Sequence, residues 1–211
     1  MSFTAACLEG AFKTCYLNGM PWEKQFERDE VLEKAMQAFW QHGYDGTSMK
    51  DLIACMGINP GSIYATFGDK KNLYCQALEY YQRQSGELFA GYEQKYSPRR
   101  AILALFEKIA DDVRRGPEHR ACFLVNAIIE AAPKDQAIDK IAQTSLRDFE
   151  AFLQKLIKAG QDEGEIDPSL DIEKTSHVLL ALIVGERVLA RGHFADDAFD
   201  DFVSQVDKLL G

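Results

Sequence analysis

The chain has few prolines and few cysteines, and both shortages restrict what it can be. Its 211 residues contain six prolines and five cysteines. No proline interrupts a long apolar-periodic stretch, so long helices are easily accommodated. The cysteine number is odd and no two cysteines have CxxC spacing, which argues against a disulfide framework and a structural zinc site. This cysteine usage fits a reducing cytoplasm.

Long apolar runs are also lacking. The longest aliphatic run is Val178–Val184, far short of the ~20 apolar residues that a membrane-spanning helix needs. The first residues show no basic start followed by an apolar run, so no signal peptide is evident. We therefore expect no membrane partner. Met20 looks like a more natural start than Met1, and we expect residues 1–23 to be a disordered extension.

Clusters of chemically active side chains are missing. The four histidines are widely separated and form no HxxxH or HExxH pattern. Nothing resembles a nucleophile–base pair or a phosphate loop. The acidic residues between Asp196 and Asp201 fit the acidic start of a helix better than a metal cluster. We expect no catalytic site, no metal, no cofactor and no enzymatic activity.

Basic charge is not in excess. The chain has 24 basic and 33 acidic side chains and a formal net charge of −9. The first 75 residues hold seven basic and nine acidic side chains, so the N-terminal part is less acidic but not basic. Composition alone does not indicate a nucleic-acid partner. Any argument for DNA must come from local motifs.

What the sequence does have is helical periodicity. Leu32, Ala35, Met36, Phe39 and Trp40 lie at i, i+3, i+4, i+7 and i+8, which is one apolar stripe of a helix. Similar stripes recur to the end of the chain without competing strand-like alternation. We predict an all-α fold of about nine helices in two domains, residues 24–75 and 76–211. The later helices are predicted near residues 70–94, 98–115, 120–131, 134–161, 171–191 and 197–210.

Two short helices joined by Gly57-Ile58-Asn59 form the motif that carries function. Ser48-x-x-Asp51 predicts a capping box at the start of the first helix. Asn59 followed by Pro60 predicts the start of the second. Two short helices with a glycine-containing turn form a helix-turn-helix, whose second helix enters the DNA major groove.

The outward face of the second helix suits contact with DNA. Ile63 and Phe67 are four residues apart and face inward, which leaves Ser62 and Tyr64 for base edges and phosphate. Free helix amides near Thr47-Ser48 and near Lys70 would attract phosphate.

The stretch Val31–Tyr74 resembles the DNA-binding domain of the TetR family. The matching pieces are Ala35-x-x-x-Phe39, Gly43-Tyr44, Thr47-Ser48, Asp51-Leu52-Ile53, Gly57-Ile58, Gly61-Ser62-Ile63-Tyr64, Phe67, Lys70 and Leu73. The resemblance implies a helix-turn-helix domain, a helical ligand-binding and dimerisation domain, and repression relieved by a small molecule. It also implies the following roles: phosphate contacts by Thr47, Tyr64 and Lys70, and groove contacts by Asn59, Pro60, Gly61 and Ser62.

One feature departs from a strong base-reading motif. No arginine or lysine lies between Gly57 and Gly68. A bidentate contact to guanine must therefore come from Arg28 or Lys50, or be replaced by weaker contacts.

The end of the chain predicts self-association. The helices at about 171–192 and 197–210 are more apolar than one buried face requires. We expect them to pair with their symmetry mates as a four-helix bundle, giving a homodimer that binds a palindromic double-stranded DNA operator.

A ligand cavity is expected between the helices near 70–94, 98–115, 118–132 and 134–161. Five aromatic residues could line it: Phe89, Phe106, Phe123, Phe149 and Phe152. They favour an apolar or aromatic small-molecule effector. The helix that begins at Lys70 would carry the signal to the DNA-binding domain.

Two alternatives stay open. The segment Arg120–Asn126, followed by Glu130, resembles a TetR subgroup in which some members sense electrophiles or oxidants through a cysteine. Cys122 is therefore a candidate sensor, although we expect it inside an apolar helix with Arg120 on another face, and a buried inert cysteine is the commoner case. The other alternative is a helical adaptor that does not bind DNA.

Overall fold

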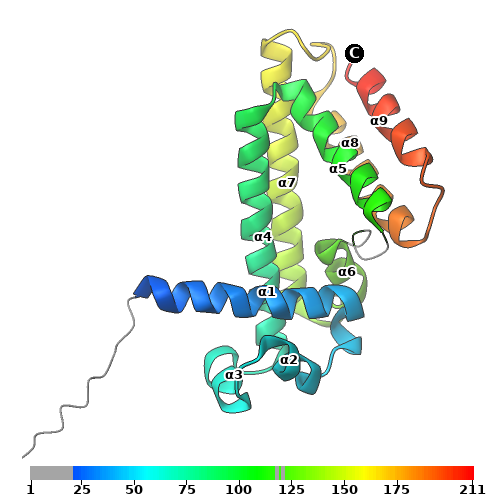
Figure 1. Cartoon of the computed structure of the whole chain (residues 1–211). Coiled ribbons are helices and arrows are strands. Elements are labelled where there is room, and N and C mark those ends of the chain that lie inside the picture. The colour runs from blue at the N-terminus through cyan, green and yellow to red at the C-terminus, as the bar shows by residue number, and fades with distance from the viewer. Residues whose placement is uncertain (1–20, 117–118, 120–121) are drawn as a thin grey trace, which may run out of the picture.

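The computed structural model describes residues 21–116, 119 and 122–211, with the side chains of 21–27 left out (Figure 1). Within these residues every regular element is helical, as predicted. Residues 1–20 of the expected disordered extension lie outside the described residues. Residues 21–23 are helical, so the predicted end of the extension at residue 23 is wrong. Pro21 occupies the first position of a helix, where the fixed φ of proline is favourable.

Three helices form the N-terminal unit: α1 (Pro21–Gly46), α2 (Met49–Met56) and α3 (Pro60–Phe67). At Gly43, where we predicted the end of the helix, the chain has a kink with φ +76°. A short helical segment follows and ends at Gly46. Only glycine adopts this backbone conformation without strain. The kink turns the chain from α1 toward α2.

Six further α-helices follow: α4 (Lys70–Lys95), α5 (Pro98–Arg115), α6 (Phe123–Glu130), α7 (Gln136–Asp162), α8 (Ile172–Arg191) and α9 (Ala198–Leu209). A 3₁₀ turn, η2 (Ala132–Lys134), precedes α7. The prediction of a helix from Arg120 is corrected, because α6 begins at Phe123 and Cys122 is its N-cap. Arg120 itself lies outside the described residues.

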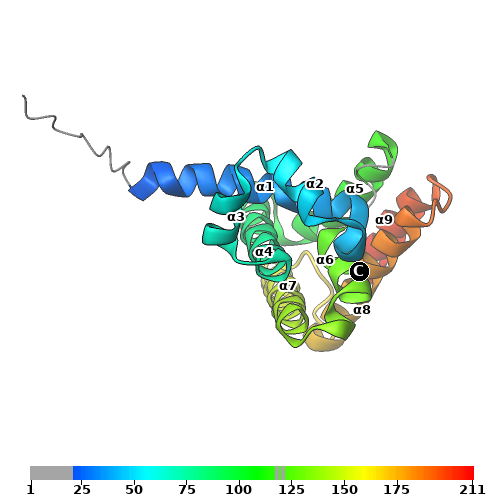
Figure 2. The same ribbon diagram turned by 90° about the horizontal axis from the view of Figure 1, so that it is seen from below.

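The long helices α4 and α7 run side by side through the molecule, and α1 crosses α4 (Figure 1). Helices α2 and α3 lie beyond α1 at one end, as the view from below also shows (Figure 2). Helix α5 packs against α7 and α9, and α8 packs against α7. Because α4 begins beside α3 and ends beside α5, it connects the N-terminal unit to the C-terminal helices.

Two apolar cores hold these elements together. The first joins α1, α2 and α3 to the start of α4 and to α6. Phe123 of α6 lies 5.4 Å from Tyr74 and 6.3 Å from Trp40 between ring centroids, so α6 packs into the N-terminal core. The second core fills the space between α5, α7, α8 and α9. Helix α6 is thus a structural part of the unit that carries the helix-turn-helix.

Candidate functional site

The predicted helix-turn-helix is present with both of its caps. Ser48 Oγ accepts a hydrogen bond from the Asp51 amide at 3.2 Å, and the Ser48 amide donates to Asp51 Oδ2 at 2.9 Å. Gly57 ends α2 in the left-handed conformation, with φ +70°. Asn59 Oδ1 accepts from the Ser62 amide at 2.8 Å and starts α3, with Pro60 in its first turn. These caps fix the angle between the two short helices.

One side of α3 is buried and the other is exposed. Ile63 and Phe67 are in the core. The predicted contact residues Asn59, Pro60, Gly61, Ser62 and Tyr64 are all exposed, and so are Ala65 and Thr66. Tyr64 is 51% exposed, so a large part of this aromatic side chain is open to a partner. The exposed face is therefore the one that a groove would accept.

Thr47 is placed differently from the role that the resemblance implies. Its side chain is fully buried, and Oγ1 donates a hydrogen bond to the Gly43 carbonyl at 2.7 Å. No surface of this side chain is left for a phosphate. Thr47 therefore positions the start of α2 against the kink, and its expected contact with DNA is corrected.

Lys70 has a neighbour that the sequence did not reveal. Its ammonium lies 4.5 Å from the centroid of the Tyr44 ring, at the start of α4. Burial raises the pKa of Tyr44, and the carboxylates of Asp135, Asp69 and Asp45 raise it further. Tyr44 thus stays protonated, and the Lys70 charge is held over its face at the edge of the helix-turn-helix.

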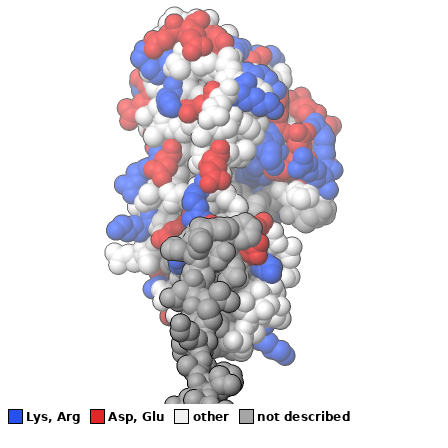
Figure 3. All heavy atoms as spheres, turned by 60° about the vertical axis from the view of Figure 1, so that its left-hand side comes forward, with Lys and Arg blue, Asp and Glu red and all other residues white. Residues whose placement is uncertain are grey.

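The two candidates for guanine readout lie apart from each other. Lys50 is exposed in the first turn of α2. Arg28, on α1, donates a hydrogen bond to Gln76 Oε1 at 2.7 Å and is anchored to α4. On the face drawn in Figure 3, basic and acidic side chains are interspersed, without one broad basic surface. Local geometry, and not overall charge, has to position DNA.

The C-terminal part holds the turn before α2 directly. Glu130, the last residue of α6, accepts hydrogen bonds from the Tyr44 amide at 3.0 Å and from the Asp45 amide at 2.8 Å. Lys134 forms an ion pair with Asp45 at 2.6 Å. We call the contact of Glu130 with residues 44–45 the Glu130 clamp. Sequence reasoning missed it because the partners are more than 80 positions apart.

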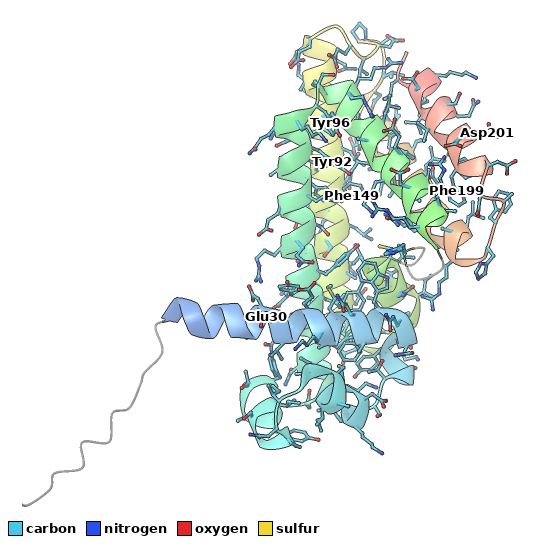
Figure 4. The ribbon with its side chains drawn as sticks, in the orientation of Figure 1. Glu30, Tyr92, Tyr96, Phe149, Phe199 and Asp201 are labelled. Atoms are coloured by element: carbon cyan, nitrogen blue, oxygen red, sulfur yellow. The ribbon has the colours of Figure 1, made fainter. Side chains whose placement is uncertain are left out.

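A cavity of about 210 Å³ lies between α4, α5, α6 and α7, where one was predicted, and α8 also lines it. Phe89 and Phe149 contribute to its wall, and Figure 4 shows Phe149 beside Tyr92, which lines it too. Phe152 stacks on Phe89 at 4.7 Å between ring centroids without lining the cavity. Phe106 and Phe123 are corrected: both are fully buried, in the second and first core respectively.

One end of this cavity carries polar groups. The Tyr81 hydroxyl lies 3.4 Å from Cys122 Sγ. Burial opposes the positive charge of Arg187, but neighbouring Cys122, Tyr81 and Asp112 outweigh it and raise the pKa of the guanidinium. Arg187 Nη1 donates to Asp112 Oδ2 at 2.9 Å. The cation beside Cys122 therefore comes from α8, 65 positions away, and could not be found from the sequence around the cysteine.

The described residues contain no group of three or more histidine, cysteine or acidic side chains placed to hold a metal ion. None of the helices in the described part of the chain is long and apolar enough to cross a membrane.

Two family models match the chain. The one described as "Bacterial regulatory proteins, tetR family" matches residues 31–77. The other, described as "Tetracyclin repressor-like, C-terminal domain", matches residues 98–206.

Relatives and solved structures agree with this match. The HTH-type transcriptional repressor ComR of Escherichia coli is 31% identical over 173 residues, covering 80% of this chain and 81% of ComR. A TetR family regulator from Cytophaga hutchinsonii has a TM-score of 0.79 at 22% identity, covering 92% and 96% of the two chains. A cysteine mutant of the TetR family regulator CifR, complexed with a 26-base-pair operator DNA, has a TM-score of 0.73 at 24% identity, covering 87% and 97%.

Proposed function

Because the chain belongs to the TetR family of DNA-binding transcriptional regulators, we propose that it is a repressor that binds a palindromic operator as a homodimer and is released by a small effector. The observation that carries this proposal is the doubly capped helix-turn-helix with an exposed α3. The relatives are regulators and not enzymes, so the proposed activity is binding alone.

In the proposed complex α3 enters the major groove. Ser62 then meets base edges, while Tyr64 and Lys70 meet phosphates on either side. Asn59 keeps its amide nitrogen for a contact, since only its oxygen is used in the cap. A two-fold dimer would require half-sites about one helical turn apart, ~34–36 Å, or a multiple of that distance.

Electrophoretic shift with DNA from upstream of the coding sequence tests this proposal. Tyr64→Phe and Lys70→Ala should weaken binding to all sequences alike, and Ser62→Ala should change sequence preference. Lys140→Ala, an exposed site on α7, is the matched control. Normal operator binding by both phosphate variants would refute the docking. If the unmodified chain shows no salt-dependent binding to duplex DNA, the alternative of a helical adaptor is favoured.

The proposed dimer uses α8 and α9. Val178, Leu182 and Val188 are exposed apolar side chains of α8, outside the set of its residues that packs into the second core. Leu209 of α9 is exposed as well. Pairing these surfaces across a two-fold axis would bury them in a four-helix bundle. Sedimentation as a monomer at micromolar concentration would contradict it.

The proposed release is a population shift. An effector in the cavity would favour a conformer whose two recognition helices are misspaced, and operator affinity would fall by the coupling energy, typically ~1–3 kcal/mol. Two connections support this route: α4 lines the cavity and begins at Lys70, and α6 ends at the Glu130 clamp.

Covalent sensing at Cys122 is the second candidate. It is supported by the placement of Cys122 in the wall of the cavity that Arg187 also lines, with its sulfur 3.4 Å from the Tyr81 hydroxyl, where a small reagent in the cavity would meet it. Cys122→Ser separates the two candidates. Loss of release by electrophiles or oxidants, with DNA binding intact, supports covalent sensing. Unchanged release by the natural effector supports the reversible cavity.

A further inference from the structure

A second cavity adjoins the first, between the DNA-binding unit and the C-terminal helices. It measures about 540 Å³ and is lined by α1, through Gln37, Trp40 and Gln41, and by α4, α5 and α8. Five side chains line both cavities: Tyr81, Ser85, Leu88, Lys108 and Arg187. The two cavities therefore meet at one wall.

The two cavities differ in chemistry. The first is walled by aromatic and aliphatic side chains such as Phe89, Tyr92 and Phe149. The second is lined by more amide and charged side chains, among them Gln37, Gln41 and Gln84. A molecule that occupied both would have one apolar end and one polar end.

The charges at the shared wall are mainly positive. Lys108, Arg115 and Arg187 line the second cavity, whereas Asp112 is the one carboxylate among its described lining residues. Asp112 is buried and bonds to both Lys108 and Arg187, so a single negative charge is divided between two cations. Positive charge is left over where the two cavities meet. An anion there would complete the pairing of groups already removed from bulk water.

Resting on the proposed function, we infer that the effector is an amphipathic organic anion. Its apolar body lies in the first cavity, and its carboxylate is bound by Lys108, Arg115 and Arg187 at the start of the second. At about 210 Å³ the first cavity alone is smaller than the ~300–1,000 Å³ of common ligand sites. The second cavity supplies the missing room as well as the charge.

This placement also connects the ligand to the DNA-binding unit. The second cavity is walled by Gln37, Trp40 and Gln41 in the last turns of α1 before the Gly43 kink. An anion held by α5 and α8 therefore contacts the helix that leads into the helix-turn-helix. A neutral apolar molecule confined to the first cavity would make no such contact.

Paired probes of equal shape test the inference. The unbranched alkanoates from hexanoate to dodecanoate are each compared with the alcohol of the same length, by calorimetry on the full chain without DNA. The chain has two tryptophans, Trp22 and Trp40. In a Trp22→Phe background, fluorescence of Trp40 reports directly on the second cavity. We expect the best alkanoate to bind at least about tenfold more tightly than its alcohol and to change Trp40 emission, because hydrogen bonds to charged groups are among the stronger ones.

Variants locate the anion. The double variant Lys108→Met with Arg115→Gln should remove most of this preference while alcohol affinity stays the same. Lys155→Met, an exposed lysine paired with Glu93 outside both cavities, should leave the preference unchanged. Equal affinity for acids and alcohols, a preference that survives the double variant, or no binding across the whole series would overturn the inference. Operator binding is measured separately without probe, so a failure of DNA binding would refute the proposed repressor and leave the anion result to be judged independently.

Discussion

Replacing Glu130 by glutamine tests whether the Glu130 clamp holds the helix-turn-helix to α6. The carboxylate uses both oxygens, one for the Tyr44 amide and one for the Asp45 amide, at 3.0 and 2.8 Å. Glutamine has the same size but only one acceptor oxygen, and its NH₂ group would face the second amide donor. One hydrogen bond is lost and the other is no longer made to a charged acceptor.

The size of the effect follows from the number and kind of these bonds. A hydrogen bond to a charged group contributes ~1.5–3 kcal/mol, and leaving a donor unpaired costs a similar amount when it is buried. The clamp is only partly buried, so we expect the lower end, about 1–2 kcal/mol. Since 1.4 kcal/mol is a factor of ten, local opening at Tyr44 and Asp45 should become roughly five- to thirtyfold more frequent.

Amide hydrogen exchange at Tyr44 and Asp45 measures this opening directly, and urea unfolding at one fixed protein concentration measures the global effect. Glu79→Gln on the exposed face of α4 is the control and should change neither. We also expect the variant to keep its cavity and to lose part of the coupling between effector and operator. Unchanged exchange at both amides would refute the idea that Glu130 holds this turn.

Three further predictions follow from single contacts. Burial raises the pKa of Glu186 to about 8, and neither carboxylate oxygen has a hydrogen-bond partner. The unfolded chain loses this proton at lower pH than the folded one, so stability falls as pH rises from about 4.5 to 8, by up to ~1.4 kcal/mol per pH unit. Glu186→Gln should reduce the difference between the urea midpoints measured at pH 5 and pH 8, and an equal difference in both proteins would contradict the prediction. Gly57→Ala should cost about 1–2 kcal/mol, because φ is +70° and no atom lies within 4 Å of the added Cβ, so backbone strain acts alone; an unchanged melting temperature would count against this. Leu182→Asp should give monomers in sedimentation without loss of helical circular dichroism, whereas the control Lys140→Asp should remain a dimer. A Leu182→Asp protein that remains a dimer would contradict the α8 interface.

Most of the helix positions could be predicted from the sequence because their causes are local. The boundary at Ser48 follows from a capping box and the one at Pro60 from proline at the first turn, and both are found within one residue. The start of α6 was predicted too early, since Cys122 is apolar but is the N-cap of the helix and not part of it. Apolar composition alone does not fix a helix end.

The site was predicted less completely, for a physical reason. The exposed face of α3 follows from the spacing of Ile63 and Phe67, which is a local property. By contrast, burial of Thr47 depends on the Gly43 carbonyl, and the cation beside Cys122 comes from α8. Phe106 and Phe123 were assigned to the cavity because they are large and apolar, but such side chains fill a core equally well. Tertiary partners decide between these roles.

Helix α6 gives the molecule a second connection between cavity and DNA-binding unit, in addition to α4. Its N-cap, Cys122, lines the cavity, and its last residue, Glu130, holds the turn before α2. Eight residues span about 12 Å at 1.5 Å each, so the helix is too short to bend and must move as one body. Glu130 packs closely against the Gly43 kink, where an added Cβ would lie 2.6 Å from its carboxylate, so a displacement of α6 would act directly on this kink. A tilt of α4 would move the start of the same unit at Lys70, so in the proposed mechanism both helices would favour the same rearrangement of α2 and α3.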